Sequence, residues 1–132
     1  DKLPTGKLIP VAGTPYDLRK PVSLEGLDLD DVYFGITPAA APAFEWRDKG
    51  IGLSLGGSPE FTHLVIFTPP NRPFFCLENQ TSSTDAHNLH VAGRVREAHL
   101  QVVAPGKKAR GHVFWKPVSL PSAEAATAGE RR

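Results

Sequence analysis

At residues 74–81 the chain reads FFCLENQT, a short apolar run that ends on a carboxylate and passes directly into polar residues. Three prolines precede this run and the polar stretch 82–85 follows it, so turn signals bound it on both sides. An apolar run bounded in this way is typical of a buried strand. The sequence therefore predicts a strand with Glu78 at its end, where functional sites tend to lie.

Glu78 allows two interpretations. Phe and Leu neighbours are expected to withdraw water from the carboxylate, which would favour its use as a general base. The alternative is that Glu78 simply marks the solvated end of a strand.

The size and charge of the chain exclude several classes of protein. Its 132 residues suit one domain, and 15 Lys and Arg nearly balance 14 Asp and Glu. This balance argues against nucleic acid or an anionic membrane as a partner. The sequence has neither an apolar stretch of membrane-spanning length nor a signal-peptide pattern, and its single cysteine, Cys76, cannot form an internal disulfide. We therefore expect a cytoplasmic protein.

The 13 prolines and 12 glycines recur throughout the chain and separate short runs rich in Val, Ile, Leu and Phe. This pattern predicts an all-β fold with little or no helix, either an antiparallel β-sandwich or an open curved sheet. Residues 1–120 form this unit, and the polar stretch 121–132 is predicted to be a disordered tail. The expected elements are a hairpin of 43–48 and 51–55, a doubly buried strand at 63–68, a loop at 79–93, and a closing hairpin of 96–103 and 110–115.

Two acidic or histidine-rich stretches invite a metal-binding interpretation. Asp85, His87 and His90 have a D-x-H-x-x-H spacing, but no second cluster completes a ligand set, and solvated loop histidines are the favoured account. The aspartates of residues 28–31 lack the Gly and distal Glu of a calcium-binding EF-hand loop. We therefore predict no metal. The chain also lacks a Gly-rich phosphate loop and a nucleophile elbow.

Four blocks resemble the aldose 1-epimerase (mutarotase) family when taken together and in order. Residues 4–19 read PTGKLIPVAGTPYDLR, similar to the family's P-T-G and G-T-P/A-F-D-F/L-R segments, and residues 29–33 read LDDVY. FCLENQT at 75–81 with DAHN at 85–88 is similar to C-[LV]-E-[PT]-Q-x…D-A-x-N, and Pro105-Gly106 matches a late turn. The resemblance covers about residues 4 to 116.

The resemblance implies a large antiparallel β-sandwich of which this chain is roughly the C-terminal half. It also implies interconversion of the α and β anomers of a free aldohexose without a cofactor. Glu78 would take the proton from the anomeric hydroxyl, and Asp30 and Gln80 would bind the sugar. Trp46 could stack on the sugar, although packing is its expected role.

The sequence departs from the family pattern at two points. Asn79 stands where the family usually has Pro or Thr, so the loop after Glu78 is expected to take a different path. The family's acid is a histidine in a G-x-H-P-Y/F segment of the N-terminal half, and this sequence contains no such segment. We therefore expect a partner, the missing N-terminal half of the same enzyme. A non-catalytic carbohydrate-binding or interaction module and a relative acting on sugar phosphates remain as alternatives.

Overall fold

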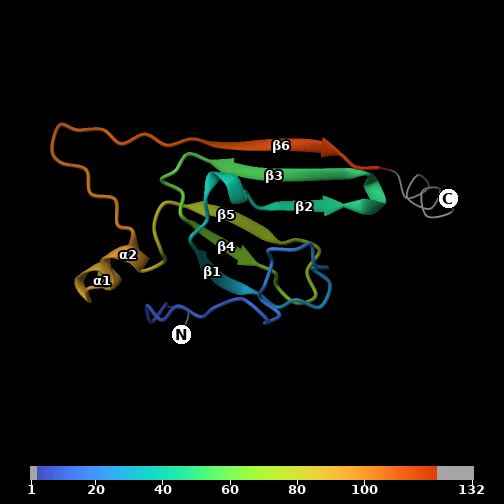
Figure 1. The fold of residues 1–132 in the computed structure, drawn as a ribbon, viewed down its shortest axis with the longest axis horizontal. Coiled ribbons are helices and arrows are strands. Elements are labelled where there is room, and N and C mark those ends of the chain that lie inside the picture. The colour runs from blue at the N-terminus through green and yellow to red at the C-terminus, as the bar shows by residue number, and fades with distance from the viewer. Residues whose placement is uncertain (1–2, 122–132) are drawn as a thin grey trace.

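The computed structural model describes residues 3–121, whose regular secondary structure consists mostly of strands in two antiparallel sheets (Figure 1). The strands are β1 (Asp30–Phe34), β2 (Ala43–Trp46), β3 (Ile51–Gly57), β4 (His63–Phe67), β5 (Cys76–Gln80) and β6 (Val113–Ser119). Within these residues, two short α-helices are present, α1 (Ala86–Val91) and α2 (Val95–Ala98), besides two 3-10 turns, η1 (Pro38–Ala40) and η2 (Arg47–Lys49). The prediction of an all-β, sandwich-like fold is confirmed.

The first sheet has the strand order β1-β4-β5, with β4 in the centre. Its register pairs Asp30 with Phe67 on one side of β4, and Val65 with Glu78 on the other. β4 was predicted to be buried, and Leu64 and Ile66 are indeed 4% and 5% exposed. They belong to one face of the sheet, whereas Val65 and Phe67 on the other face are only half-buried.

The second sheet has the order β2-β3-β6 and contains the predicted hairpin. Phe44 lies opposite Leu53 and Trp46 lies opposite Ile51, so these four side chains share one face of the hairpin. Between the strands, η2 is capped by Gly50, whose φ of 64° is a left-handed conformation that glycine adopts without steric cost.

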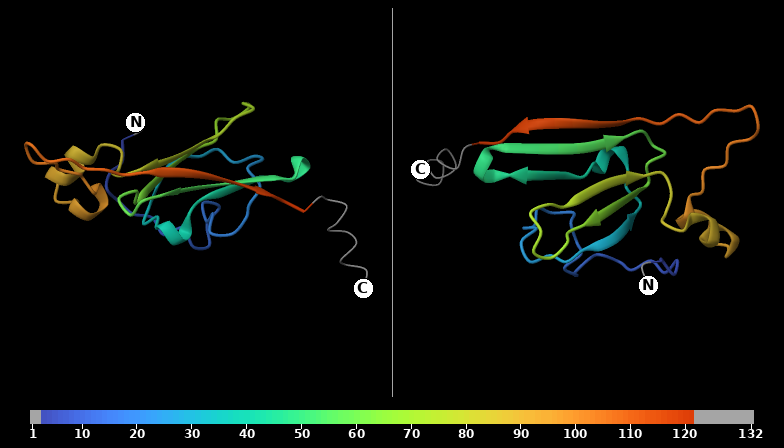
Figure 2. Two further views of the ribbon diagram at one scale, coloured as in Figure 1. Left: turned by 90° about the horizontal axis from the view of Figure 1, so that it is seen from above. Right: turned by 180° about the vertical axis from the view of Figure 1, so that it is seen from behind.

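The core lies on one face of the first sheet. Leu29, Leu64 and Ile66 are buried together there, and Leu18, Leu27, Tyr33, Ile36 and Leu77 pack around them. Residues of the segment before β1 therefore pack on this face. Figure 2 shows the fold from two further directions. Complete burial of each Leu or Ile side chain contributes about 1.5–3 kcal/mol to folding.

The structure corrects three expected elements. β5 begins at Cys76 and lies at the edge of its sheet, and Phe74 is 53% exposed, so the strand is not fully buried. α1 and α2 occupy much of the region expected to be a loop and the start of the closing hairpin. No strand forms at 96–103, and β6 instead pairs with β3. Residues 122–132 of the predicted tail lie outside the described residues.

The alternating pattern of 96–103 misled the prediction because alternation shows only that a strand is possible, while a strand also needs a partner edge. Val95 to Ala98 instead pack against α1, where Ala86, Leu89 and Ala98 form a small buried cluster. None of the helices in residues 3–121 has the length and apolar character needed to cross a bilayer.

Candidate functional site

Asp30, Glu78 and Gln80 lie on one face of the first sheet. Residues directly opposite each other in an antiparallel sheet share a face, and so do residues two positions apart along a strand. The register gives two rows across the strands, Asp30–Phe67–Cys76 and Val32–Val65–Glu78. Asp30 therefore shares the face of Glu78, and Gln80 follows two residues further along β5. We call this surface the open face, because the core packs on the opposite side.

Val65 and Phe67 of β4 lie between the two carboxylates on the open face. Both side chains are half-buried and present an apolar floor between β1 and β5. The sequence does not identify Val65 and Phe67 as site residues, because an uninterrupted apolar run gives no indication of which alternate residues face the core. The strand register supplies that missing information.

Glu78 is exposed in the structure, and so is Asp30. The expectation that Phe and Leu neighbours would bury the Glu78 carboxylate is therefore wrong. Leu77 points to the core face with Leu64 and Ile66, whereas Glu78 points to the open face and is exposed there. Sequence neighbours in a strand alternate between faces, so they do not shield each other.

A histidine–threonine network lies beside Gln80, at the end of β4. His63, the cross-strand partner of Gln80, is 1% exposed, and its Nε2 donates to the carbonyl oxygen of Glu97 at 2.9 Å. Thr62 Oγ1 lies 2.9 Å from His63 Nδ1 and 3.0 Å from His99 Nδ1. His99 Nδ1 also donates to the carbonyl oxygen of Thr81 at 2.6 Å.

The proton positions in this network follow from its acceptors. Carbonyl oxygens only accept, so His63 Nε2 and His99 Nδ1 carry protons, and the Thr62 hydroxyl donates to His63 Nδ1. Burial lowers the pKa of His63 below its ordinary 6.5, which agrees with a neutral ring. Both ring nitrogens of His63 therefore form hydrogen bonds within the protein. The network links α2 and the residue that follows β5 to the start of β4.

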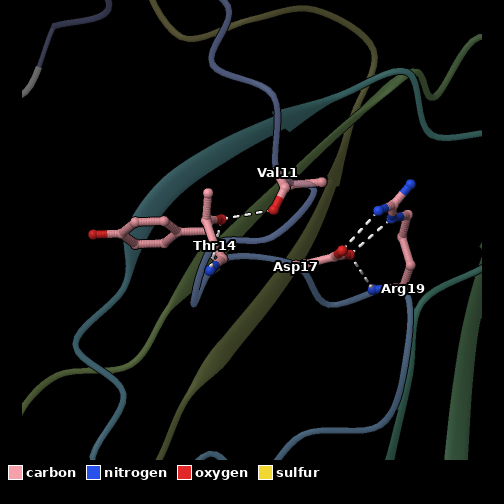
Figure 3. Close-up of polar contacts among 5 residues, drawn as sticks. Val11, Thr14, Asp17 and Arg19 are labelled. Carbon is pink, nitrogen blue, oxygen red and sulfur yellow. Dashed lines mark hydrogen bonds and ion pairs between the residues drawn. The ribbon is translucent and has the colours of Figure 1, made fainter.

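The loop that precedes β1 is braced by short polar contacts (Figure 3). Thr14 Oγ1 donates to the Val11 carbonyl oxygen at 2.7 Å, and Arg19 Nε donates to Asp17 Oδ1 at 2.7 Å. The hydrogen-bonded Arg19 side chain lowers the pKa of Asp17 from 3.8 to about 2. The contribution of the Asp17–Arg19 contact to stability is complete above pH 3.8 and is lost as the pH falls through about 2.

Comparison with protein families gives one match. The family model described as aldose 1-epimerase matches residues 1–114, which is most of the chain. The chain belongs to the aldose 1-epimerase family. No curated protein and no solved structure matches it.

Membership of the aldose 1-epimerase family confirms the resemblance stated from the sequence. The match includes β1, β5 and all of the open face. The other candidates do not join this face: Trp46 belongs to the second sheet, where it packs edge-on against Phe44 with 4.6 Å between ring centroids. Asp85, His87 and His90 do not converge, and among the described residues no three His, Cys, Asp or Glu side chains are placed to hold a metal ion.

Proposed function

We propose that this chain carries the proton acceptor and sugar-binding groups of an aldose 1-epimerase. The Glu78 carboxylate takes the proton from the anomeric hydroxyl of a free aldohexose. The ring C–O bond opens to the aldehyde as the ring oxygen is protonated, and rotation about C1–C2 lets the ring close on the other face. Asp30 accepts hydrogen bonds from sugar hydroxyls, and the Gln80 amide adds a further polar contact.

The observation that supports this proposal is the common face of Asp30, Glu78 and Gln80. Asp30 and Glu78 are two strands apart and offset by two residues, so standard strand spacings put their Cα atoms about 12 Å apart. That separation leaves room for one pyranose ring between the side chains. The apolar floor of Val65 and Phe67 offers a surface for the C–H groups of the ring, as aromatic and aliphatic side chains do in sugar sites.

The reaction also needs an acid at the ring oxygen. His63 lies on the open face, but both of its nitrogens are engaged within the protein. We propose that the acid comes from an N-terminal half of the same enzyme, which would cover the open face and remove Glu78 from bulk water. The monosaccharide would then be bound between the two halves.

The test is anomeric equilibration of fresh α-D-glucose and α-D-galactose, followed by polarimetry. The complete gene product is expected to accelerate equilibration, and the Glu78→Gln variant is expected to lose about 10²–10⁴-fold in rate, the usual contribution of a general base. Glu45→Gln, which changes an exposed strand glutamate of the second sheet, serves as the matched control. An undiminished rate in Glu78→Gln removes Glu78 from the mechanism.

A non-catalytic carbohydrate-binding module is the second candidate, and the exposure of Glu78 favours it. This candidate predicts saturable binding of the same sugars with an uncatalysed rate of anomeric equilibration. Binding together with acceleration of equilibration would rule it out.

A further inference from the structure

Arg96 of α2 lies at one end of the open face. The strand register continues this face to a third row, Phe34–His63–Gln80, in which Phe34 is the last residue of β1. The guanidinium carbon of Arg96 is 5.3 Å from the centre of the Phe34 ring, a distance typical of a cation–π contact. The face that carries the two candidate carboxylates therefore also carries a cation.

The buried His63 side chain fixes the surroundings of this cation. Its Nε2 donates to the carbonyl oxygen of Glu97, the residue after Arg96, at 2.9 Å. The Phe34 ring packs against the His63 ring with 4.9 Å between the ring centroids. Because stacking on a held ring restricts the long Arg96 side chain, less conformational entropy is lost when a ligand binds it.

The Arg96 guanidinium is available to a ligand. Arg96 is exposed, and within residues 3–121 its side chain forms neither an ion pair nor a hydrogen bond. Arg19 and Arg47, in contrast, each contact a neighbouring carboxylate. The N–H donors of Arg96 therefore have no acceptor within the part of the chain that the structure describes.

Phe34 and Asp30 flank Val32 symmetrically along β1. Each lies two residues from Val32, whose row across the sheet contains Val65 and Glu78. Standard strand spacings therefore put the Phe34 Cα about 12 Å from that of Glu78 and about 13 Å from that of Asp30. Val65 lies inside the triangle that these positions define, so a sugar ring above Val65 can approach all of its corners.

The charges at the corners orient the sugar ring. A carboxylate only accepts hydrogen bonds, and a guanidinium only donates them. With the anomeric hydroxyl at Glu78, one side of a pyranose ring carries the hydroxyls of C2 and C3, which can donate to Asp30. The other side carries the ring oxygen and the C6 substituent, whose oxygens can accept from Arg96. The layout therefore places C6 at the Arg96 corner.

We propose that Arg96 is a specificity-determining residue of the sugar site, which binds the C6 substituent of the aldose and favours a carboxylate there, as in a hexuronic acid. This inference rests on the proposed function. The planar guanidinium matches a carboxylate with parallel hydrogen bonds, which are stronger than those to a neutral hydroxyl. Asp30 and Glu78 lie farther from this corner than the Debye length of about 8 Å at physiological ionic strength, so their repulsion of the ligand is largely screened.

The test compares D-galacturonic acid, D-galactose and D-fucose, which share one ring configuration and differ only in the carboxylate, hydroxymethyl or methyl group at C6. Each sugar is titrated into the complete gene product by calorimetry, and kcat/KM for anomeric equilibration is measured by polarimetry. Affinity is expected to fall in the order given, with D-galacturonic acid bound about ten-fold more tightly than D-fucose.

Replacement of Arg96 should change this selectivity rather than sugar binding as a whole. Arg96→Met is expected to bring the ratio of the two affinities to about one, with D-fucose bound as before, because its methyl group makes no hydrogen bond. Arg96→Lys keeps the charge without the planar fork and should give an intermediate ratio. Arg47→Met, which changes an exposed arginine between β2 and β3, should leave the ratio as it is in the unaltered chain.

Three results would overturn the assignment of Arg96. These are equal ratios in Arg96→Met and Arg47→Met, equal affinity of the unaltered chain for D-galacturonic acid and D-fucose, and no binding of any of the three sugars. If Arg96→Met loses the native circular dichroism spectrum, an unchanged ratio in Arg96→Lys counts against the assignment instead. The expected order of affinities without faster equilibration would reject the epimerase proposal and leave the assignment of Arg96 standing. Faster equilibration with equal ratios would do the reverse.

Discussion

At the scale of single residues, Thr68 fixes the position of the chain next to Asp30. Its hydroxyl accepts a hydrogen bond from the Leu29 backbone N–H at 2.8 Å and donates to the Leu27 carbonyl oxygen at 2.9 Å. Thr68 is 5% exposed and Leu29 is 1% exposed, so water cannot replace these bonds. The Thr68 side chain therefore fixes the start of β1 and with it the position of Asp30.

Replacing Thr68 by Val tests this role. The valine keeps the shape but leaves the Leu29 N–H and the Leu27 carbonyl without their side-chain partner, which should lower the free energy of unfolding by about 1–3 kcal/mol. Urea denaturation measures the change. Thr68→Ser keeps the hydroxyl and is expected to recover most of the loss. Equal stability of Thr68→Val and the unaltered chain would show that these bonds contribute nothing.

The candidate carboxylates show how far single residues can be predicted. Glu78 and Asp30 were located from sequence blocks, and strand alternation makes a common face possible. Their exposure was not predictable, because it depends on which layer covers the sheet, and no local pattern encodes that. His63 and Thr62 were missed as a network for the same reason, since His99 and Glu97 reach them from a segment expected to be a strand.

At the scale of elements, local structure was predicted and distant pairing was not. The β2–β3 hairpin has its turn signal and both strands within 43–57, so its pattern contains the whole element. α1 and α2 are too short to show a helical period, and they depend on packing against each other. β6 pairs with β3 although residues 58–112 separate the two strands in the sequence.

Gly56 makes the β3–β6 pairing testable. It lies directly opposite Phe114, and a Cβ at Gly56 would come 2.1 Å from the Phe114 ring. Gly56→Ala should displace the ring and destabilise the fold by about 1–3 kcal/mol, the usual cost of overpacking. Thermal unfolding followed by circular dichroism measures this. Gly52→Ala in the same strand is the control, because its Cβ would meet neighbours only at 3.4 Å or more.

A double variant tests whether a steric clash with the Phe114 ring causes the loss of stability in Gly56→Ala. Adding Phe114→Ala to Gly56→Ala should remove the steric conflict, so the double variant should be more stable than the sum of the single effects predicts. Simple additivity of the two changes would contradict a direct contact between the ring and position 56.

At the scale of the whole molecule, the helical segment is held to the first sheet by the histidine–threonine network. His63 is neutral because burial disfavours its charged form, and His99 adds an unfavourable charge nearby when protonated. The guanidinium of Arg96 also lies 5.3 Å from the centre of the Phe34 ring, next to His63. Protonation of His63 would therefore weaken the attachment of α2.

The stability of the protein should accordingly depend on pH. Because the folded pKa of His63 lies below its ordinary 6.5, the unfolded chain binds more protons in the interval between the two values. The contribution of neutral His63 to the free energy of unfolding is complete above pH 6.5. It is lost as the pH falls toward the pKa of His63 in the folded protein. Urea denaturation between pH 5 and 8 measures this slope, which should become shallower in His63→Gln and remain in His87→Gln, where an exposed histidine is changed. An identical slope in His63→Gln would contradict this role.

The pairing of β6 with β3 also determines the order in which the chain can assemble. The β2–β3 hairpin closes across η2 alone, and hairpins of this kind form in about 1–10 μs. Joining Val113 to Gly57 requires closure of the long intervening chain, so we expect β6 to dock last. Until then, one edge of β3 has unpaired N–H and C=O groups, and a nascent chain stopped short of residue 113 would present that edge to other chains for aggregation.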